Sequence, residues 1–174
     1  MTRGYLLDTC IVSIWFDPSH PRFEAVEGHI RSLPSDAPLR ISVVTLGEVE
    51  YGHLADSPQG PTPVQQQFLS FLRMKFIDGA PEILDVRRST TSCYGQLRAA
   101  LFEKFAPAGR RRKAKRVEEL VNPVTSRELG IQENDVWLAA QAIEYRLVLV
   151  TEDKMTHIRK VARGFKLDIE DWTR

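Results

Sequence analysis

Four acidic residues stand where a strand-like run ends or a helix-like run begins. They are Asp8 in YLLDT, Glu48 in SVVTLGEVEYG, Asp135 in GIQENDVWLAAQA and Asp153 in LVLVTEDK. Successive members are 40, 87 and 18 residues apart, so no local turn can bring them together. Only a fold that gathers the ends of its strands could do so. We therefore predict that the four carboxylates converge on one site.

A cluster of carboxylates is electrostatically costly unless a cation neutralises it. Carboxylates at close range repel one another and raise one another's pKa. Mg²⁺ or Mn²⁺ relieves this repulsion, because both ions prefer hard oxygen ligands. A metal held in this way can stabilise charge that develops on a phosphodiester and lower the pKa of a bound water. The chemistry that the four acids predict is phosphodiester hydrolysis.

Each acid also has a simpler interpretation as a helix cap or as a favourable charge on a helix dipole. Asp8 and Asp153 could cap the helices that follow them. Thr45 and Glu48 have the spacing of a capping box. Asp135 could interact with the dipole of the helix that it begins. Taken together, however, these roles do not explain why two acids at strand ends accompany two acids at helix starts.

The bulk composition predicts one globular domain that spans residues 1–174. The chain is 43% hydrophobic and 27% charged, and its formal net charge of +1 indicates no particular class of partner. A chain of this length can bury one sizeable core. No apolar run is long enough for a membrane-spanning helix, and the N-terminus lacks the pattern of a signal peptide, so we expect a cytoplasmic protein. Cys10 and Cys93 lack the spacing of a disulfide framework or a zinc site, and both are expected as small reduced core residues.

Apolar runs typical of strands alternate with runs of helical periodicity along the chain. This alternation predicts a mostly parallel sheet with helices on both faces and a ligand crevice at the carboxyl ends of the strands. Strands are predicted at Gly4–Leu7, Leu39–Val44, Glu82–Val86 and Leu147–Val150, and within FKLDIEDW. Helices are predicted after Asp8, around Phe23–Ile30, from Thr45, over Val64–Phe76, over Ser89–Phe105, and through Val136–Ile143 with Asn134 as its cap.

Four strings of the sequence resemble the motifs of the PIN-domain family. They are YLLDTCIVS, ISVVTLGEVEYG, IQENDVWLAAQAI and LVTEDKMTHI, with a weaker echo in KLDIEDW. Within that family the strings are most similar to the VapC-type toxins of bacterial toxin-antitoxin (VapBC) pairs. They follow the family's order and span almost the whole chain. The resemblance implies a three-layer α/β/α sandwich around a mostly parallel sheet.

The resemblance also implies an activity. Such proteins are Mg²⁺- or Mn²⁺-dependent endoribonucleases that cut structured or single-stranded RNA, are held silent by a cognate antitoxin and commonly form homodimers. Glu48 matches the family's motif better than Glu50, which lies about 200° away around a helix. The resemblance implies that the metal-binding and catalytic acids are Asp8, Glu48, Asp135 and Asp153. It implies that the polar residues orienting them are Thr9, Asn134 and Thr151.

A basic segment at about residues 107–116 departs from the compact members of the family. We consider two interpretations, a solvated surface loop and a contact with the RNA backbone. If all its charges engaged single-stranded phosphates, the log-log salt slope of binding would be at most about 4. An acidic antitoxin tail could compete for the same residues. The segment holds Arg110, Arg111, Arg112, Lys113, Lys115 and Arg116.

Other classes of protein fit the sequence less well. A haloacid-dehalogenase-type phosphatase needs a second Asp where Cys10 stands, and a receiver-type signalling domain needs an acidic pair after the first strand. No P-loop, GxSxG elbow or dinucleotide fingerprint is present. The alternative that we keep is a non-catalytic PIN-like RNA-binding or regulatory module with structural acids. Trp15, Phe16 and Trp137 are expected in the core or on a dimer surface, rather than as platforms for stacked bases.

Overall fold

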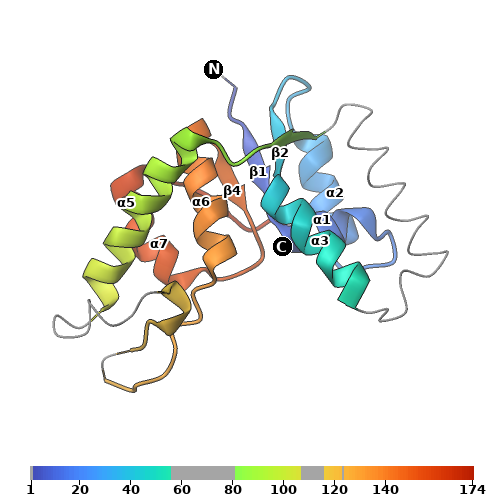
Figure 1. Cartoon of the computed structure of the whole chain (residues 1–174). Helices are drawn as coiled ribbons and strands as arrows, with labels where there is room; N and C mark the ends of the chain where they lie inside the picture. The colour runs from blue at the N-terminus through green and yellow to red at the C-terminus, as the bar shows by residue number, and fades with distance from the viewer. Residues whose placement is uncertain (1, 56–80, 107–115, 123) are drawn as a thin grey trace.

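The computed structural model describes residues 2–55, 81–106, 116–122 and 124–174. Within these ranges, short strands alternate with helices, as the apolar periodicity predicts (Figure 1). The strands are β1 (Tyr5–Leu7), β2 (Leu39–Ser42), β3 (Glu82–Leu84), β4 (Val148–Val150) and β5 (Ile169–Glu170). The helices are α1 (Thr9–Phe16), α2 (Phe23–Ser32), α3 (Val43–Ala55), α5 (Arg88–Phe105), α6 (Glu133–Tyr145) and α7 (Thr156–Ala162). The helix predicted over Val64–Phe76 and residues 110–115 of the basic segment lie outside the described residues.

The five strands form one parallel sheet in the order β3-β2-β1-β4-β5. In the central register Leu7 pairs with Ile41 of β2 on one side and with Val150 of β4 on the other. The chain therefore proceeds from β1 to one neighbour and later returns to the opposite one. Such a change of direction opens a crevice at the carboxyl ends of the strands. That crevice lies where β1 and β4 end.

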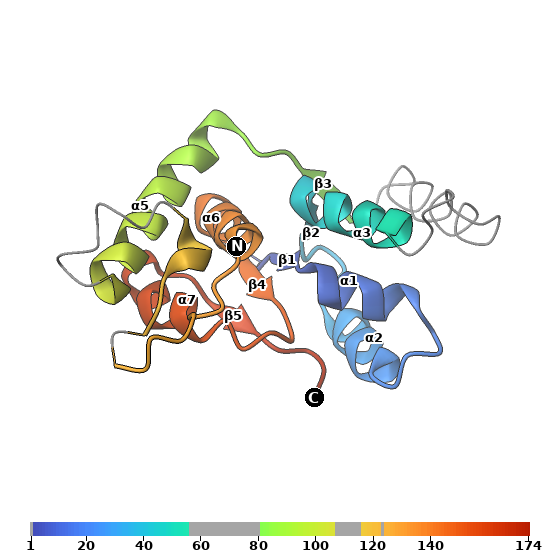
Figure 2. The ribbon, with the colours of Figure 1, turned by 60° about the horizontal axis from the view of Figure 1, so that its bottom comes forward.

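The two faces of the sheet are buried by different helices, which confirms the predicted α/β/α sandwich (Figure 2). Leu6 and Leu149 pack in the core cluster that contains residues of α5, α6 and α7. Leu7, Ile41 and Val150 pack instead with residues of α1 and α2. Alternate strand residues thus serve opposite cores, as the period of two in a strand requires. Within the described part of the chain, no helix is long and apolar enough to cross a membrane.

The caps of α3 and α6 differ from the predicted ones. Ser42, rather than Thr45, caps α3, because its Oγ accepts the backbone N–H of Val44 at 2.9 Å. The expected capping box is therefore wrong. Asn134 does not cap α6, which begins at Glu133 and has no side-chain cap. Both predictions failed because they used local spacing alone, whereas the Asn134 side chain has a tertiary partner that is described below.

The two acids predicted to cap helices at strand ends behave differently from each other. Asp8 is the N-cap of α1, and its carboxylate accepts the backbone N–H of Thr9 at 2.7 Å. Asp153 caps no helix, because α7 begins only at Thr156, after Met155. The capping explanation therefore holds for Asp8 and fails for Asp153, whose position needs another reason.

Candidate metal centre

Asp8 lies at the carboxyl end of β1 and is almost completely buried, with 4% of its surface exposed. The backbone N–H of Asp8 donates to Val150 O of β4, which fixes it against the neighbouring strand. The carboxylate accepts hydrogen bonds at both oxygens. Thr9 N donates to Oδ1 and Thr151 Oγ1 donates to Oδ2, each at 2.7 Å. These bonds hold the carboxylate in a single orientation at the switch point of the sheet.

Glu48 is brought to Asp8 by α3, and two side chains hold it there. Thr9 Oγ1 donates to Glu48 Oε2, while Asn134 Nδ2 donates to Glu48 Oε1 at 2.6 Å. Thr9 therefore bonds two of the acids, one through its backbone and the other through its hydroxyl. Asn134 connects the same cluster to the first turn of α6, where Asp135 is its neighbour.

Asp153 is positioned by the loop after β4. Its backbone N–H donates to Thr151 Oγ1 at 3.0 Å, and that hydroxyl in turn donates to Asp8. Thr151 is completely buried, so its hydroxyl is held between the two acids. The three polar residues that the resemblance singles out, Thr9, Asn134 and Thr151, thus all contact the acids or the backbone beside them.

Asp135 is the acid whose titration is most strongly perturbed. Burial, followed by the charges of Asp8 and Asp153, raises its pKa to about 7. Burial also raises the pKa of Asp8, and the charges of Asp153 and Glu48 add to this, although the bonds from Thr151 and Thr9 oppose it. Asp8 and Asp135 therefore both feel the negative charge of neighbouring acids, a repulsion that a bound cation would relieve.

Cys10 is a neighbour of the acids that was not predicted from the sequence as part of the site. Its Sγ lies 3.7 Å from Asp8 Oδ2 and 3.4 Å from Thr151 Oγ1. Burial, together with the charge of Asp8, raises the pKa of this thiol to about 12. Both cysteines are free and partly buried, and Cys10 packs against the core cluster of α1 and α2. Its spacing of two from Asp8 was the only available signal.

The donor set suits a divalent cation. Among the described residues, Asp8, Cys10 and Asp153 offer ligand atoms that all lie within 4.8 Å of one another. Glu48 and Asp135 are not in this closest group, but they interact electrostatically with it. Most of the donors are carboxylate oxygens, which favours a hard ion such as Mg²⁺ or Mn²⁺. The residues present therefore fit the metal that the resemblance implies.

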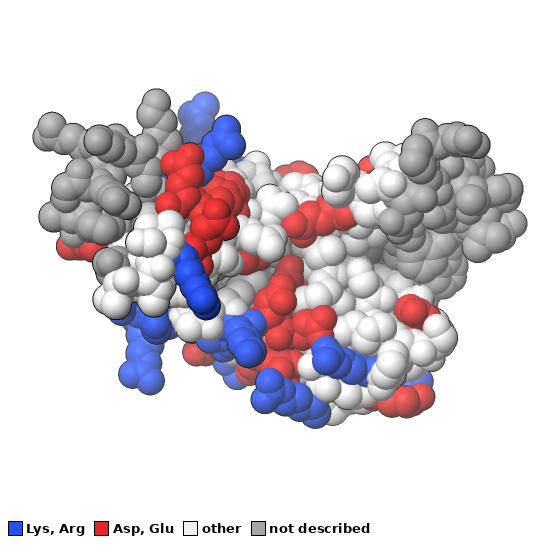
Figure 3. Space-filling model, turned by 90° about the horizontal axis from the view of Figure 1, so that it is seen from below, with Lys and Arg blue, Asp and Glu red and all other residues white. Residues whose placement is uncertain are grey.

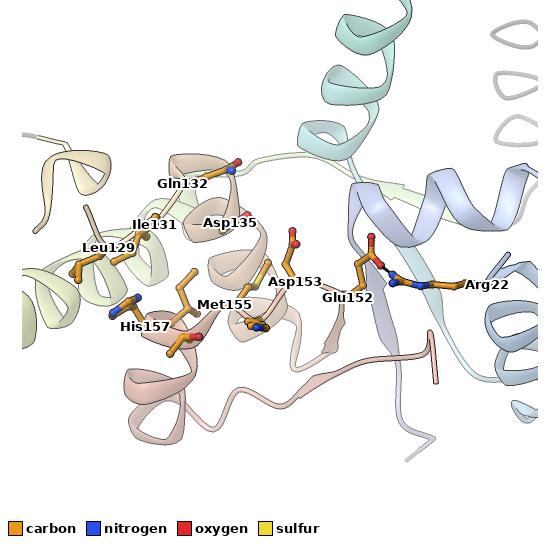
Figure 4. A pocket seen from close by; sticks show the side chains of 13 residues that line it. Arg22, Leu129, Ile131, Gln132, Asp135, Glu152, Asp153, Met155 and His157 are labelled. Atoms are coloured by element: carbon orange, nitrogen blue, oxygen red, sulfur yellow. Dashed lines mark hydrogen bonds and ion pairs between the residues drawn. The ribbon is translucent and has the colours of Figure 1, made fainter. Parts of the chain in front are cut away.

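A cavity of about 660 Å³ opens beside the acids, lined by Asp135 and Asp153 and by residues of α7 (Figure 4). Arg22 lies at one end of this cavity and forms an ion pair with Glu152. Lys154 also lines it. Cations beside an acidic centre are what a phosphodiester needs in order to approach, since carboxylates alone would repel it. Neither Arg22 nor Glu152 was singled out in the sequence.

The surface view agrees with this arrangement. Figure 3 shows Asp and Glu side chains gathered along the middle of one face, with Lys and Arg side chains beside and below them. Of the basic segment, only Arg116 is described, and it is exposed. Its role in binding RNA stays a prediction.

Comparisons with known proteins bear on the fold. No protein-family model and no curated protein matches the sequence. Solved structures do match. The structure of VapBC2 from Rickettsia felis bound to a DNA fragment from their promoter has a chain 26% identical to this one, with a TM-score of 0.63 and coverage of 97% of this chain and 98% of that chain.

The fold is a PIN-domain fold of the VapC type. Two further structures support this. VapBC-1 of nontypeable Haemophilus influenzae matches with 18% identity, a TM-score of 0.64 and coverage of 98% of both chains. VapBC-5 of Mycobacterium tuberculosis, described as a member of the VapBC family of toxin-antitoxin systems, matches with 21% identity, a TM-score of 0.57 and coverage of 98% and 99%. These matches cover 97–98% of this chain, and the acids lie at the edge of the sheet in that fold.

Proposed function

We propose that this chain is a Mg²⁺- or Mn²⁺-dependent endoribonuclease that acts as the toxin of a toxin-antitoxin pair. The observation that carries the proposal is the convergence of Asp8, Glu48, Asp135 and Asp153 at the switch point of the sheet. The raised pKa values of Asp8 and Asp135 support it, because neighbouring carboxylates contribute to both and a cation would relieve their repulsion. A purely structural role would not require four acids from four segments to share one site.

Each acid has a part in the proposed centre. Asp8 and Asp153 offer the closest carboxylate oxygens, and Glu48 is held ready by Thr9 and Asn134. The bound cation would stabilise the charge that develops on the phosphodiester and lower the pKa of a nearby water. Asp135 lines the cavity beside Asp153, and one of the acids would share the role of general base toward the attacking water.

Other side chains would bind the substrate. Lys154 and Arg22 line the cavity beside Asp135 and Asp153, where they can interact with the phosphates of a bound strand. To bind a phosphate, Arg22 must give up its ion pair with Glu152 and pair with the phosphate instead. An exposed pair of this kind is worth about 1 kcal/mol or less, so the exchange is affordable.

An antitoxin and a second copy are the partners that the proposal includes. The structural neighbours named above are described as VapBC structures, and one of them is bound to promoter DNA. By analogy with them, a cognate antitoxin would bind this chain and silence it. Dimerisation is proposed on the resemblance alone.

The nuclease proposal is tested with purified, antitoxin-free protein and a mixed pool of tRNA and rRNA in Mg²⁺ or Mn²⁺. Discrete cleavage products are expected from the parent and not from Asp8→Asn, which removes a charge with little change of volume. Asp85→Asn is the matched control, since Asp85 is an exposed acid that follows β3 of the same sheet. Intact RNA with folded parent protein, or equal cleavage by Asp8→Asn, would refute the proposal.

A further inference from the structure

A second cavity is lined by both partners of the Glu48–Asn134 hydrogen bond. Its volume is about 610 Å³, within the roughly 300–1,000 Å³ of small-molecule sites. Glu48 and Asn134 both line it, so it shares a wall with the carboxylate cluster. The full lining is Val43, Val44, Gly47, Glu48, Tyr51, Val86, Asn134 and Trp137.

The chemistry of this cavity differs from that of the first. None of its eight described lining residues is cationic, and Glu48 is the one acid among them. Valine and aromatic side chains supply most of the remaining surface. Such a lining repels a phosphate and suits an uncharged, planar group. Arg22 and Lys154, which suit phosphates, line the other cavity instead.

One face of α3 forms a wall of the cavity. Val44, Gly47, Glu48 and Tyr51 recur at i, i+3, i+4 and i+7, so they share a side of the helix. Tyr51 is 73% exposed although it lines the cavity, so its ring is accessible. Gly47 contributes no side chain, and within the described part of the chain a Cβ added there would meet no atom within 4 Å. The cavity is therefore open in front of Gly47.

Trp137 of α6 lines the cavity from the facing element, and its ring is held rigidly. The indole stacks on Tyr94, with ring centroids 3.8 Å apart and an interplanar angle of 12°. The Tyr94 hydroxyl donates to Glu133, which fixes the ring beneath it. Because Tyr94 covers one face of the indole, the cavity meets the other face or the edge. A rigid aromatic surface loses little entropy when a planar ligand binds.

We propose that this cavity binds an unpaired nucleobase of the RNA, next to the phosphodiester that is cleaved. The inference rests on the proposed ribonuclease function and assigns it a substrate class. The shared wall of Glu48 and Asn134 places the base beside the acids, while the adjoining phosphates meet the cations of the other cavity. In a duplex the bases are stacked and paired, so only an unpaired base can enter. The substrate is therefore single-stranded at this position, and Trp137 contacts it rather than serving only the core.

A pair of glycine variants tests the proposal. Gly47→Leu places a side chain in the cavity, starting from a Cβ that meets no described atom within 4 Å. Gly52→Leu is the matched control, because Gly52 lies on the same helix, also has nothing within 4 Å and does not line the cavity. Both are made in an Asp8→Asn background, and affinity for short random-sequence RNA is measured by fluorescence anisotropy, with the RNA single-stranded or annealed as a duplex.

The expected result is tighter binding of the single strand than of the duplex, and single-strand affinity reduced about tenfold by Gly47→Leu but not by Gly52→Leu. Equal affinities of the two glycine variants, equal binding of both RNA forms, or no RNA binding would overturn the proposal. Unchanged RNA affinity of Gly47→Leu, together with a lower mass in sedimentation, would also overturn the proposal. The cavity would then be a contact between copies of the chain.

The assay separates this proposal from the function on which it rests. Binding is measured without cleavage, so the subsite can hold even if the parent protein leaves RNA intact. Conversely, cleavage by the parent together with equal RNA affinities of the two glycine variants would keep the nuclease and remove the subsite.

Discussion

Thr151 links two of the acids through its hydroxyl. Its buried hydroxyl donates to Asp8 and accepts the backbone N–H of Asp153. Side chains in this position orient metal ligands, and their loss commonly weakens metal binding 10- to 100-fold, by order of magnitude. Thr151→Val keeps the shape of the side chain and removes only this hydroxyl.

We expect Thr151→Val to weaken Mn²⁺ binding by roughly 10- to 100-fold, as measured by isothermal titration. The matched control is Thr2→Val, because Thr2 Oγ1 donates to Asp36 at the same 2.7 Å on the surface. If Thr151→Val and Thr2→Val bind Mn²⁺ with the affinity of the parent, Thr151 does not organise a metal centre.

Asp135 makes the stability of the metal-free protein depend on pH. Its pKa of about 7 lies above the value of about 3.9 for an unfolded aspartate. Between these values the folded chain holds a proton that the unfolded chain has released. The free energy of unfolding therefore falls as the pH rises from about 4 to about 7.

Asp135→Asn should remove this loss of stability at high pH. In chelator, we expect it to be at least about 1 kcal/mol more stable than the parent at pH 8, and to have no such advantage near pH 4. Urea denaturation at both pH values measures the difference, with Asp85→Asn as the control. An advantage of equal size at both pH values would contradict the assigned titration.

At the scale of elements, the amino end of β1 packs too closely for a side chain. A Cβ on Gly4 would lie 2.6 Å from Leu147 Cδ2 and 3.2 Å from Pro38 Cβ. We expect Gly4→Ala to lower the free energy of unfolding by about 1–3 kcal/mol. Cleavage should persist at temperatures where the variant is folded, since Asp8 lies at the other end of the strand.

The effect of Gly4→Ala on stability is measured by thermal unfolding, monitored by circular dichroism. Gly28→Ala in α2 is the control, because its added Cβ meets nothing within 4 Å and alanine favours a helix by up to about 1 kcal/mol. Equal melting temperatures for Gly4→Ala and the parent would show that the strand end can relax.

The sequence predicted the elements well and several helix starts badly. Short apolar runs identified the strands, because in a sheet covered on both faces alternate residues are buried against opposite cores. The caps of α3 and α6 were missed, since Asn134 binds Glu48 across 86 residues of sequence and Ser42 takes the role assigned to Thr45. Local spacing carries no information on such tertiary partners.

At the scale of the whole molecule, the fold could be predicted because its motifs span nearly the whole chain. The position of the acids followed from strand ends in a parallel sheet. Cys10, Arg22 and the cavity beside Trp137 could not be predicted, because they depend on which loops and helices meet at that edge. The order β3-β2-β1-β4-β5 is what brings those elements together.

The basic segment at residues 107–116 gives a prediction for the intact protein. Replacing its six Lys and Arg residues by Ser should weaken RNA binding and lower the log-log salt slope by at most about 4. Affinity measured over a series of salt concentrations gives both quantities. An unchanged slope would assign the segment to solvent or to the antitoxin.

The most direct test of the metal centre follows metal binding and RNA cleavage together while Mn²⁺ is returned to chelated protein. The account predicts that cleavage appears in proportion to the bound metal, and that Asp8→Asn loses both while Asp85→Asn keeps both. RNA cleavage by the fully chelated protein, or parent-like Mn²⁺ binding by Asp8→Asn, would contradict it.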